Sequence, residues 1–410
     1  MPSARTRATS TPQLNGVGEW PEVGLDTESL IAGGWQPIPI REYVIKLSSR
    51  CNLSCDYCYI YTKADHSWSS RPALVQRETV EATSARISQH AQKHGLRTIR
   101  IVLHGGEPLL AGVSLISDAV TLIREHLSPK IGVDLRLQTN GTLLDAALLD
   151  IMRALDIRIG VSLDGGSVHH DRHRKYADGR GSYKSVAHAL RLLNLPAYRD
   201  LFAGLLCTVD LKNDPLDVYQ TLLAFAPPQL DLLLPHGTWS SVPPQRTANP
   251  DTPYADWLSA VFDNWYSDPH QQTGIRLFEE IIQLLLGGRS RSDQVGISPA
   301  DYLIVDTDGT LQLTDSLKTA YAGAPEIGLN VFEHAIDEAL LHPSVIARQI
   351  GLSALADECR NCNIVAVCGG GHYAHRYRPG AGFKNPSVFC ADLDKLIGHI
   401  WQRISPVIQT

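Results

Sequence analysis

The sequence predicts an α/β protein built as an incomplete, six-unit version of the eight-fold β/α barrel. Short apolar runs alternate with helical patterns, and this alternation indicates parallel βαβ units with right-handed crossovers. Six runs are strand candidates: YVIKL (43–47), IRIVL (99–103), VDLRL (133–137), IRIGVSL (157–163), LFAGLLCTV (201–209) and LDLLL (230–234). Between the second and third runs, apolar residues recur at helical spacing: Ile116, Val120, Ile123 and Leu127. We therefore expect functional side chains at the carboxyl ends of the strands.

Four regions are predicted along the 410 residues: an N-terminal arm (1–40), the partial barrel (41–235), a helical linker region (236–300) and a cysteine-rich C-terminal region (301–410). The arm is rich in Thr, Ser, Gly and Pro, which indicates an extended or partly disordered segment. The Pro-rich stretch 235–253 breaks the alternation of strands and helices. Beyond it we expect helices over 254–267 and 275–287, and a hairpin over 302–313.

Bulk composition excludes some classes of partner. The formal net charge is -6, which provides no general attraction to nucleic acid or an anionic membrane. The longest apolar runs, such as IIQLLLGG (281–288), fall short of the roughly 20 residues that span a bilayer. No apolar stretch follows the charged N-terminus to form a signal peptide. We therefore expect a cytoplasmic protein that binds neither nucleic acid nor membrane.

Seven of the eight cysteines fall into two groups, and the eighth, Cys207, stands between them. The first group lies in RCNLSCDYCY (50–59), where Cys51, Cys55 and Cys58 are spaced C-x3-C-x2-C. In a reducing compartment such grouping favours metal over disulfides. Three thiolates on a 4Fe–4S cluster leave one iron open to a small molecule. A zinc site with water as its fourth ligand, or an incidental thiol cluster, is the alternative.

The spacing of the first group, with the aromatic Tyr57 before the third cysteine, resembles the radical S-adenosylmethionine (SAM) superfamily. The resemblance implies that Cys51, Cys55 and Cys58 hold a 4Fe–4S cluster whose open iron binds SAM. It also implies reductive cleavage of SAM to a 5'-deoxyadenosyl radical, which removes a hydrogen atom from an unactivated C–H bond. An external electron donor, such as a flavodoxin or ferredoxin, is then expected.

Further motifs follow successive strand candidates: HGGEP (104–108), QTNG (138–141), SLDG (162–165) and DRHR (171–174). Adjacent glycines let backbone approach a ligand closely, and an arginine fork can donate two parallel hydrogen bonds to a carboxylate. The resemblance implies that SAM is contacted by Tyr57, Gly105, Gly106, Glu107, Asn140, Ser162 and Arg174. Glu107 is expected to accept a bond from the SAM ammonium group. The alternative for Asn140 and Asp164 is a helix cap or a turn.

The second cysteine group, within 358–390, is spaced C-x2-C-x5-C-x21-C. Four thiolates complete the coordination of a cluster, so its expected role is electron transfer or structure, with zinc as the alternative. The pattern resembles the SPASM extension of peptide-modifying radical SAM enzymes, which implies an auxiliary 4Fe–4S cluster on Cys359, Cys362, Cys368 and Cys390. His372, and Thr314 after Gly309, stand where the full pattern has cysteines of an inner cluster. We therefore expect two clusters, not three.

Three longer phrases resemble the FxsB-type branch of peptide maturases: LLPHGTW (233–239), TDGTLQLTDSLK (307–318) and CGGGHYAHRYRPGAGFKNPSVFCADL (368–393). This resemblance covers essentially residues 35–400 and implies a ribosomally synthesised precursor peptide as substrate. The implied product carries a crosslink from an aromatic or other side chain to an unactivated β-carbon, a three-residue cyclophane. A formylglycine-generating sulfatase maturase is the other enzymatic interpretation. An iron–sulfur scaffold or electron carrier is the non-enzymatic one.

The catalytic base and the leader-binding surface are less clearly marked. Candidates for the base are Asp210, His236 and Asp315; the alternatives are a strand-end turn residue, a satisfied core histidine and a loop carboxylate. HRYR (375–378) offers three basic residues for an acidic leader, against the alternative of a solvated loop. The 40-residue arm is too short for a separate leader-binding domain. We expect the catalytic body or another protein to hold the leader.

Overall fold

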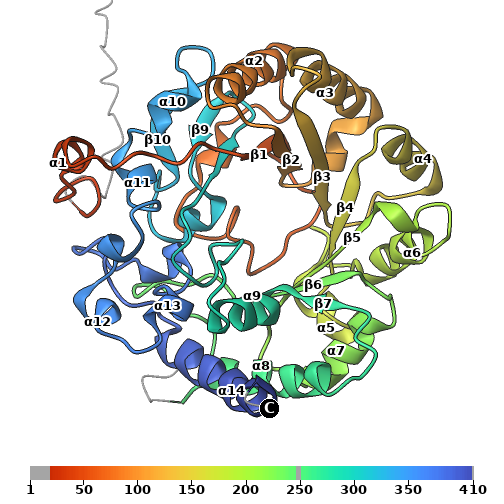
Figure 1. The fold of residues 1–410 in the computed structure, drawn as a ribbon. Coiled ribbons are helices and arrows are strands. Elements are labelled where there is room, and N and C mark those ends of the chain that lie inside the picture. Colours follow the sequence, from red (N-terminus) through yellow and green to blue (C-terminus); the bar gives the residue numbers. More distant parts are fainter. Residues whose placement is uncertain (1–18, 246–250, 409–410) are drawn as a thin grey trace, which may run out of the picture.

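The computed structural model describes residues 19–245 and 251–408, and its strands form one open sheet that curves around the centre of the molecule (Figure 1). The order of the strands in the sheet is β10-β9-β8-β1-β2-β3-β4-β5-β6-β7. Their bounds are β1 (Glu42–Ser48), β2 (Thr98–Gly105), β3 (Gly132–Thr139), β4 (Arg158–Ser162), β5 (Phe202–Thr208), β6 (Gln229–Leu233), β7 (Gly274–Ile275), β8 (Tyr302–Val305), β9 (Thr310–Gln312) and β10 (Glu326–Asn330).

The six predicted barrel strands are confirmed as β1 to β6, and each pairs in parallel with the next. The two-residue strand β7 was not predicted; it extends the parallel set beyond β6. The hairpin expected over 302–313 is confirmed as β8 and β9, which are antiparallel. Its first strand also pairs in parallel with β1, with Tyr43 opposite Leu303. The barrel sheet therefore continues into the C-terminal region.

The helices lie outside the curved sheet (Figure 1). Their bounds are α1 (Thr27–Ala32), α2 (Arg77–Lys93), α3 (Gly112–His126), α4 (Ala146–Ala154), α5 (Ser167–His173), α6 (Tyr183–Leu193), α7 (Pro215–Leu223), α8 (Pro253–Tyr266), α9 (Arg276–Leu285), α10 (Ile336–Ala339), α11 (Pro343–Ile346), α12 (Asp357–Arg360), α13 (Val365–Cys368) and α14 (Cys390–Ile408). The two helices predicted in the linker region are confirmed as α8 and α9. None of these described helices has the length and apolar character needed to cross a bilayer.

One hydrophobic core joins the barrel to the C-terminal region. The predicted inner face of α3 is buried at Ile116, Val120 and Ile123. The same cluster of buried apolar residues runs from Ile40 to Ile404 on α14, which packs against α8 and α9. Because burial of apolar surface is the main favourable term in folding, this continuous core ties the predicted regions together energetically. The division at residues 235 and 300 stays a prediction about sequence organisation.

The described part of the N-terminal arm is more ordered than the sequence predicted; residues 1–18 lie outside the described residues. Asp26 caps the short helix α1 by accepting a hydrogen bond from the Ser29 N–H at 2.9 Å. The Trp20 carbonyl accepts a bond from the Phe383 N–H at 3.3 Å. A Cβ at Gly382 would lie 2.0 Å from that carbonyl oxygen, so the close approach requires glycine. The arm thus docks onto the C-terminal region.

Candidate functional site

The three-cysteine loop leaves β1 at the carboxyl edge of the sheet, as predicted. Cys51, Cys55 and Cys58 are partly buried, and each thiol lies close enough to another to influence its ionisation. Burial raises the pKa of Cys51 to about 11 and that of Cys55 to about 12. A thiolate is the form that ligates metal, so the anionic form of these sulfurs needs a bound cation to stabilise it here.

The spacing of the cysteine sulfurs argues against a mononuclear zinc site. Tetrahedral zinc with Zn–S bonds of about 2.3 Å places its sulfur ligands roughly 3.8 Å apart. Among the described residues, no three cysteine sulfurs lie within 4.8 Å of one another, although two groups containing histidine do. A multi-iron cluster separates its terminal ligands more widely, because each thiolate binds a different iron. This wider separation of the sulfurs is compatible with a 4Fe–4S cluster.

Gly105 and Gly106 pack the end of β2 against the cysteine loop. A Cβ at Gly105 would lie 2.1 Å from the Ser48 carbonyl oxygen, and one at Gly106 would lie 2.4 Å from that of Arg50. The Gly106 N–H donates to Ser48 at 2.8 Å, and the Glu107 N–H donates to Arg50 at 2.9 Å. The sequence predicted close approach of a ligand here. In the structure the close approach is that of the chain's own backbone.

The Glu107 carboxylate is fully buried and binds three groups of the protein. Its oxygens accept bonds from the Leu109 N–H at 3.0 Å, the Thr139 hydroxyl at 2.7 Å and the Asn140 N–H at 2.8 Å. Burial raises the pKa of this carboxyl, although these hydrogen bonds oppose the shift. Glu107 thus joins the ends of β2 and β3, and its contact with the SAM ammonium group stays a prediction.

Asn140 connects the end of β3 to the cysteine loop. Its Nδ2 group lies 3.7 Å from Cys51 Sγ and donates to the Asn52 side chain at 2.9 Å. Its Oδ1 atom accepts a bond from the Thr142 N–H at 2.9 Å, the turn-forming contact that was the alternative interpretation. The side chain therefore shapes a turn and also steadies a cluster ligand. A contact between Asn140 and SAM stays a prediction.

Tyr57, Asp164 and Arg174 meet although they are far apart in the sequence. The Tyr57 hydroxyl donates to Asp164 and accepts from the Arg174 guanidinium at 2.8 Å. Burial lowers the pKa of Arg174, but Tyr57, Cys55 and Asp164 more than reverse this, so the guanidinium stays charged. Its Nε atom is buried and has no hydrogen-bond partner among the described residues. An unfilled buried donor beside a cluster ligand fits an anionic ligand group such as the SAM carboxylate.

Ser162 ends β4, and its hydroxyl accepts a bond from the Gln138 side chain at 3.2 Å. Nearby, two residues that sequence reasoning missed hold the site together. The Asp164 N–H donates to His170 Nδ1 at 3.3 Å, and His170 Nε2 lies 2.9 Å from the Ser182 hydroxyl. That hydroxyl donates to the Arg174 carbonyl at 2.7 Å. His170 stands directly before DRHR (171–174) in the sequence. Only the folded chain reveals that it orients Asp164.

Asp315 is a base candidate close enough to the three-cysteine loop to influence it electrostatically. Its charge is one of the influences that raise the pKa of Cys58, after burial. Lys46 Nζ lies 2.6 Å from Asp315 and 3.1 Å from Asp306, and both carboxylates are almost fully buried. Burial lowers the pKa of Lys46, but the two carboxylates outweigh it and keep the ammonium charged. Asp315 is thus a buried, ion-paired carboxylate, not a solvated loop carboxylate.

His104 is a further polar residue of the barrel interior that sequence reasoning missed. It is opposite Lys46 in the register of β1 and β2, and its Nδ1 atom is buried without a hydrogen-bond partner among the described residues. Burial lowers its pKa, so the ring is neutral. A lysine and a histidine inside apolar strand runs were the sequence signal that could have revealed this pair.

Asp210, another base candidate, is held by ion pairs. Burial alone would raise its pKa, but bonds from the Lys212 N–H, His173 and Arg172 lower it overall. His173 Nε2 lies 3.1 Å from its carboxylate, and Arg172 also donates to it. Ion pairs of this kind lower the proton affinity of a carboxylate, and the Lys46 pair acts on Asp315 in the same direction. Asp210 is therefore an ion-paired residue at the end of β5, close to the turn role named as its alternative.

The second cysteine group surrounds a tightly bonded glycine loop. Cys359, Cys362, Cys368 and Cys390 lie within α12, between α12 and α13, at the end of α13 and at the start of α14. Their charges influence one another, and burial raises the pKa of Cys368 to about 12. Arg376 donates to the Gly369, Gly370 and Gly371 carbonyl oxygens at 2.6–3.2 Å. The four thiols therefore meet around a rigid loop.

HRYR (375–378) was expected to be a solvated basic loop or a leader-binding surface, and that expectation is wrong for two of its residues. His375 and Arg376 are buried, at 4% and 8% exposure. Arg376 is committed to glycine carbonyls of the cysteine loop. Arg378 stacks instead over the Trp239 ring, with 4.6 Å from the guanidinium carbon to the ring centroid. The segment supports the second cysteine group instead of presenting charge to solvent.

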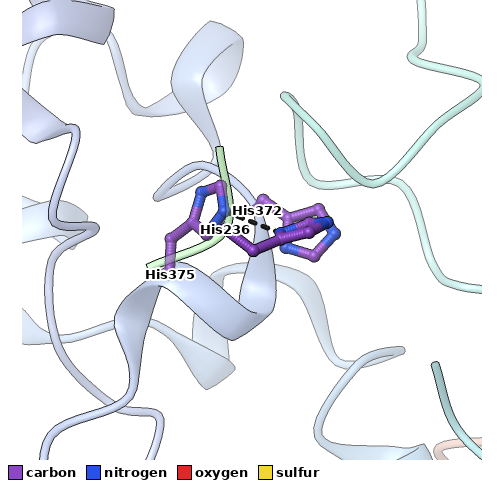
Figure 2. A group of neighbouring side chains, drawn as sticks. All are labelled: His236, His372 and His375. Carbon is purple, nitrogen blue, oxygen red and sulfur yellow. Dashed lines mark hydrogen bonds between the residues drawn. The ribbon is translucent and has the colours of Figure 1, made fainter. Parts of the chain in front are cut away.

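His236, the third base candidate, lies in a group of three histidines (Figure 2). Its Nδ1 atom lies 3.1 Å from His375 Nε2, and the His372 ring faces both. Burial lowers the pKa of His236 to about 3 and also lowers those of His372 and His375. His236 is therefore a neutral ring in a histidine cluster, beyond the simple core histidine named as its alternative.

Comparison with known proteins agrees with the family resemblance found in the sequence of the barrel. Residues 45–195 match the sequence profile of the Radical SAM superfamily. This stretch is thus similar to a radical SAM domain. The chain is 23% identical over 350 residues to the cysteine-type anaerobic sulfatase-maturating enzyme of Clostridium novyi, covering 84% of this chain and 90% of that one. It is 26% identical over 348 residues to the serine-type enzyme of Klebsiella aerogenes, covering 83% and 81%.

Solved structures agree on the fold. Native anSMEcpe with bound AdoMet superposes with a TM-score of 0.77 at 23% identity, covering 90% of this chain and 99% of that one. Streptococcus suis SuiB bound to precursor peptide SuiA superposes with a TM-score of 0.56 at 14% identity, covering 88% and 78%. The α/β fold is that of a radical SAM barrel with a C-terminal extension. The donor sets described above fit one SAM and two 4Fe–4S clusters.

Proposed function

We propose that this radical SAM protein is an enzyme that oxidises a peptide side chain at its β-carbon. The observation that carries the proposal is the Arg174 guanidinium, with its unfilled buried Nε donor, placed beside Cys55 and the Tyr57–Asp164 pair. A structural cluster would have no use for such a donor. The relatives named above, which mature sulfatases, support a protein or peptide as substrate.

In this proposal Cys51, Cys55 and Cys58 hold the first cluster, and the four C-terminal cysteines hold the second. When bound, the first cluster and SAM supply a 5'-deoxyadenosyl radical that takes a hydrogen atom from the substrate. Arg174 binds the SAM carboxylate, while Ser162 and Asn140 are proposed SAM contacts from the ends of β4 and β3. A flavodoxin or ferredoxin provides the electron that SAM cleavage consumes.

Asp315 is the proposed proton acceptor. After a hydrogen atom leaves the β-carbon, the substrate must lose one electron and one proton to reach a closed-shell product. The Asp315 carboxylate is buried near Cys58, and its pair with Lys46 holds it in place. The second cluster is the proposed electron acceptor. The neutral His104 ring, opposite Lys46, offers a route by which the proton can leave.

Formylglycine formation is the product that the comparisons favour. Relatives named as cysteine-type and serine-type sulfatase-maturating enzymes align over more than four fifths of this chain. For a serine, loss of two hydrogens yields the aldehyde directly. For a cysteine, loss of two hydrogens yields a thioaldehyde, which water converts to the aldehyde with release of hydrogen sulfide. Both routes begin with the same β-hydrogen and end with the same group.

Crosslinking of a precursor peptide is a second candidate, favoured by the ligands that this chain lacks. Thr314 and His372 occupy the positions where the full SPASM pattern has inner-cluster cysteines. Apart from the two groups, the described residues contain one cysteine, Cys207, which is buried in β5. In this chemistry the carbon radical adds to a neighbouring side chain before the electron and proton leave. The product again loses two hydrogens, but contains a ring.

The proposal is tested with anaerobically reconstituted protein, SAM and dithionite, using a cysteine-containing sulfatase peptide, its serine counterpart, and a peptide encoded beside the gene. Formation of 5'-deoxyadenosine and a modified peptide is expected. An aldehyde that reacts with a hydrazide identifies formylglycine. Loss of two hydrogens without aldehyde reactivity, with a new link between side chains in fragmentation spectra, identifies the crosslink. No 5'-deoxyadenosine from cluster-loaded protein would contradict enzymatic activity altogether.

A further inference from the structure

Three histidines from two distant segments of the chain lie together (Figure 2). His236 lies in the loop after β6, His372 follows α13, and His375 belongs to a short 3-10 helix (Tyr373–Arg376). Ring centroids are 5.2 Å apart for His236 with each of the others and 4.8 Å apart for His372 with His375. One potential ligand nitrogen from each residue lies within 4.8 Å of the others.

The three rings form an incomplete hydrogen-bond network. One bond links two of them, His236 Nδ1 to His375 Nε2 at 3.1 Å, while His372 Nδ1 accepts the Ala374 N–H at 3.2 Å. In the neutral rings, the His236–His375 bond and the Ala374 contact already use a lone pair on two of the three histidines. A divalent cation that took one nitrogen from each ring would replace these two contacts with three metal–nitrogen bonds.

A second cluster of similar composition lacks this character. His90 and His94 on α2 both contact Asp337, at 2.6 Å and 2.8 Å. There, His90 Nε2 also accepts the Ile40 N–H at 3.0 Å, and Lys93 Nζ pairs with Asp337 at 2.6 Å. Those groups are already satisfied by protein partners and attach α2 to α10. This cluster therefore serves as a control for the first.

We propose that His236, His372 and His375 bind one divalent transition-metal ion, zinc in the first instance. Three imidazole ligands with one open position is the coordination found in catalytic zinc sites. The Asp293 carboxylate lies 3.5 Å from His372 Nε2, where it would orient the ring as carboxylates orient metal-bound histidines. Zinc–nitrogen bonds of about 2.0–2.1 Å require the ligand atoms to move together by roughly 1 Å, within reach of side-chain rotation.

The proposed metal site has a neighbour of one cysteine group on each side. The Tyr59 ring, next to Cys58, contacts His236 edge-on at 4.9 Å between centroids. On the other side, His375 precedes Arg376, which binds the glycine carbonyls after Cys368. His372 itself occupies a position where the SPASM pattern has an inner-cluster cysteine. A mononuclear ion thus stands between the two iron–sulfur sites, in the region that an inner cluster would otherwise fill. This inference does not depend on the proposed reaction.

The test uses the full-length protein with both iron–sulfur clusters reconstituted, exposed to zinc alone and then desalted. One zinc per chain is expected by mass spectrometry of the metals. The zinc absorption edge should show nitrogen ligands at about 2.0–2.1 Å. Zinc below one tenth per chain, or sulfur ligands at about 2.3 Å, would overturn the proposal, because sulfur would place the ion on unoccupied cysteines.

Substitutions separate this site from adventitious binding. His236→Ala and His372→Ala should each lower zinc occupancy at least tenfold, while His94→Ala in the control cluster leaves it unchanged. Asp293→Asn should weaken zinc binding by about 10- to 100-fold, as expected for a residue that positions a ligand. Iron content verifies that each variant is folded; if one is not, the ligand distances in the unaltered protein still decide. Equal zinc in the folded histidine variants would also overturn the proposal.

Discussion

The two cysteine groups are built in opposite ways. The three-cysteine loop takes its supporting residues from the ends of three further strands, with Asn140 and Arg174 reaching Cys51 and Tyr57 across the barrel mouth. The four-cysteine group is supported from within its own segment, where Arg376 binds successive glycine carbonyls. The first site retains an unfilled buried donor, and the second is closed by local bonds. This contrast indicates one site made for a ligand and one made for a cluster alone.

The largest predicted difference follows from removing one cysteine in each group. Cys55→Ala should abolish 5'-deoxyadenosine formation, because the cluster that binds SAM loses one of three ligands. Cys362→Ala should retain formation of 5'-deoxyadenosine but lose peptide product. Chromatography of both products, with iron content as the measure of cluster loading, distinguishes the two. Equal loss of SAM cleavage in both folded variants would contradict the division of roles.

A smaller effect is expected at Arg174. Arg174→Gln removes a charged donor that contacts Tyr57 and is proposed to bind the SAM carboxylate. Hydrogen bonds to charged groups contribute about 1.5–3 kcal/mol, so SAM affinity should fall roughly 10- to 100-fold. Equilibrium binding of SAM to the cluster-loaded protein measures this. Arg376→Gln provides the matched control and should leave SAM affinity unchanged. A fall in SAM affinity in Arg376→Gln but not in Arg174→Gln would contradict the proposed role of Arg174.

Much of this contrast could be predicted from the sequence, and part of it could not. The six strands follow from local periodicity, which is a short-range feature of the sequence. Both ligand sets rest on thiol spacing, also a short-range feature, and stay predictions. The sequence could not reveal that the Glu107 carboxylate accepts hydrogen bonds from Thr139 and Asn140, or that Lys46 forms an ion pair with Asp315. These pairs form only when distant strands align. The expectation for HRYR was wrong for the same reason. Its Arg376 donates to backbone carbonyl oxygens, and the sequence carries no signal for such partners.

A comparison of variants at Asp315 and Asp306 distinguishes a structural role of Asp315 from a catalytic one. Asp315→Asn should lower the free energy of unfolding by about 2 kcal/mol, because buried Lys46 loses a charged partner. Asp306→Asn removes the other partner and should cost a similar amount. Denaturant titration measures both effects. Only Asp315→Asn should reduce peptide product relative to 5'-deoxyadenosine. A matching reduction in Asp306→Asn would show that loss of Lys46 pairing, not loss of a base, is responsible.

The smallest expected effect is the pH dependence contributed by His170. Burial lowers its pKa to about 2 in the folded protein, against about 6.5 when unfolded. Below pH 6.5 the unfolded chain therefore binds a proton that the folded chain does not, and stability falls with acid. At pH 5.5 the loss is about 1.4 kcal/mol. His170→Gln should reduce this slope in thermal unfolding from pH 7.5 to 5.5, although other buried histidines retain part of it.

The central claim is that the three-cysteine cluster keeps an iron open for SAM while the four-cysteine cluster does not. Electron paramagnetic resonance tests it most directly, on dithionite-reduced protein in which Cys359→Ala and Cys362→Ala remove the second cluster. Adding SAM should shift the signal of the remaining cluster. In the complementary variant with Cys51→Ala and Cys55→Ala, SAM should leave the spectrum unchanged. An unperturbed signal in the first variant, with the cluster intact, would contradict the account.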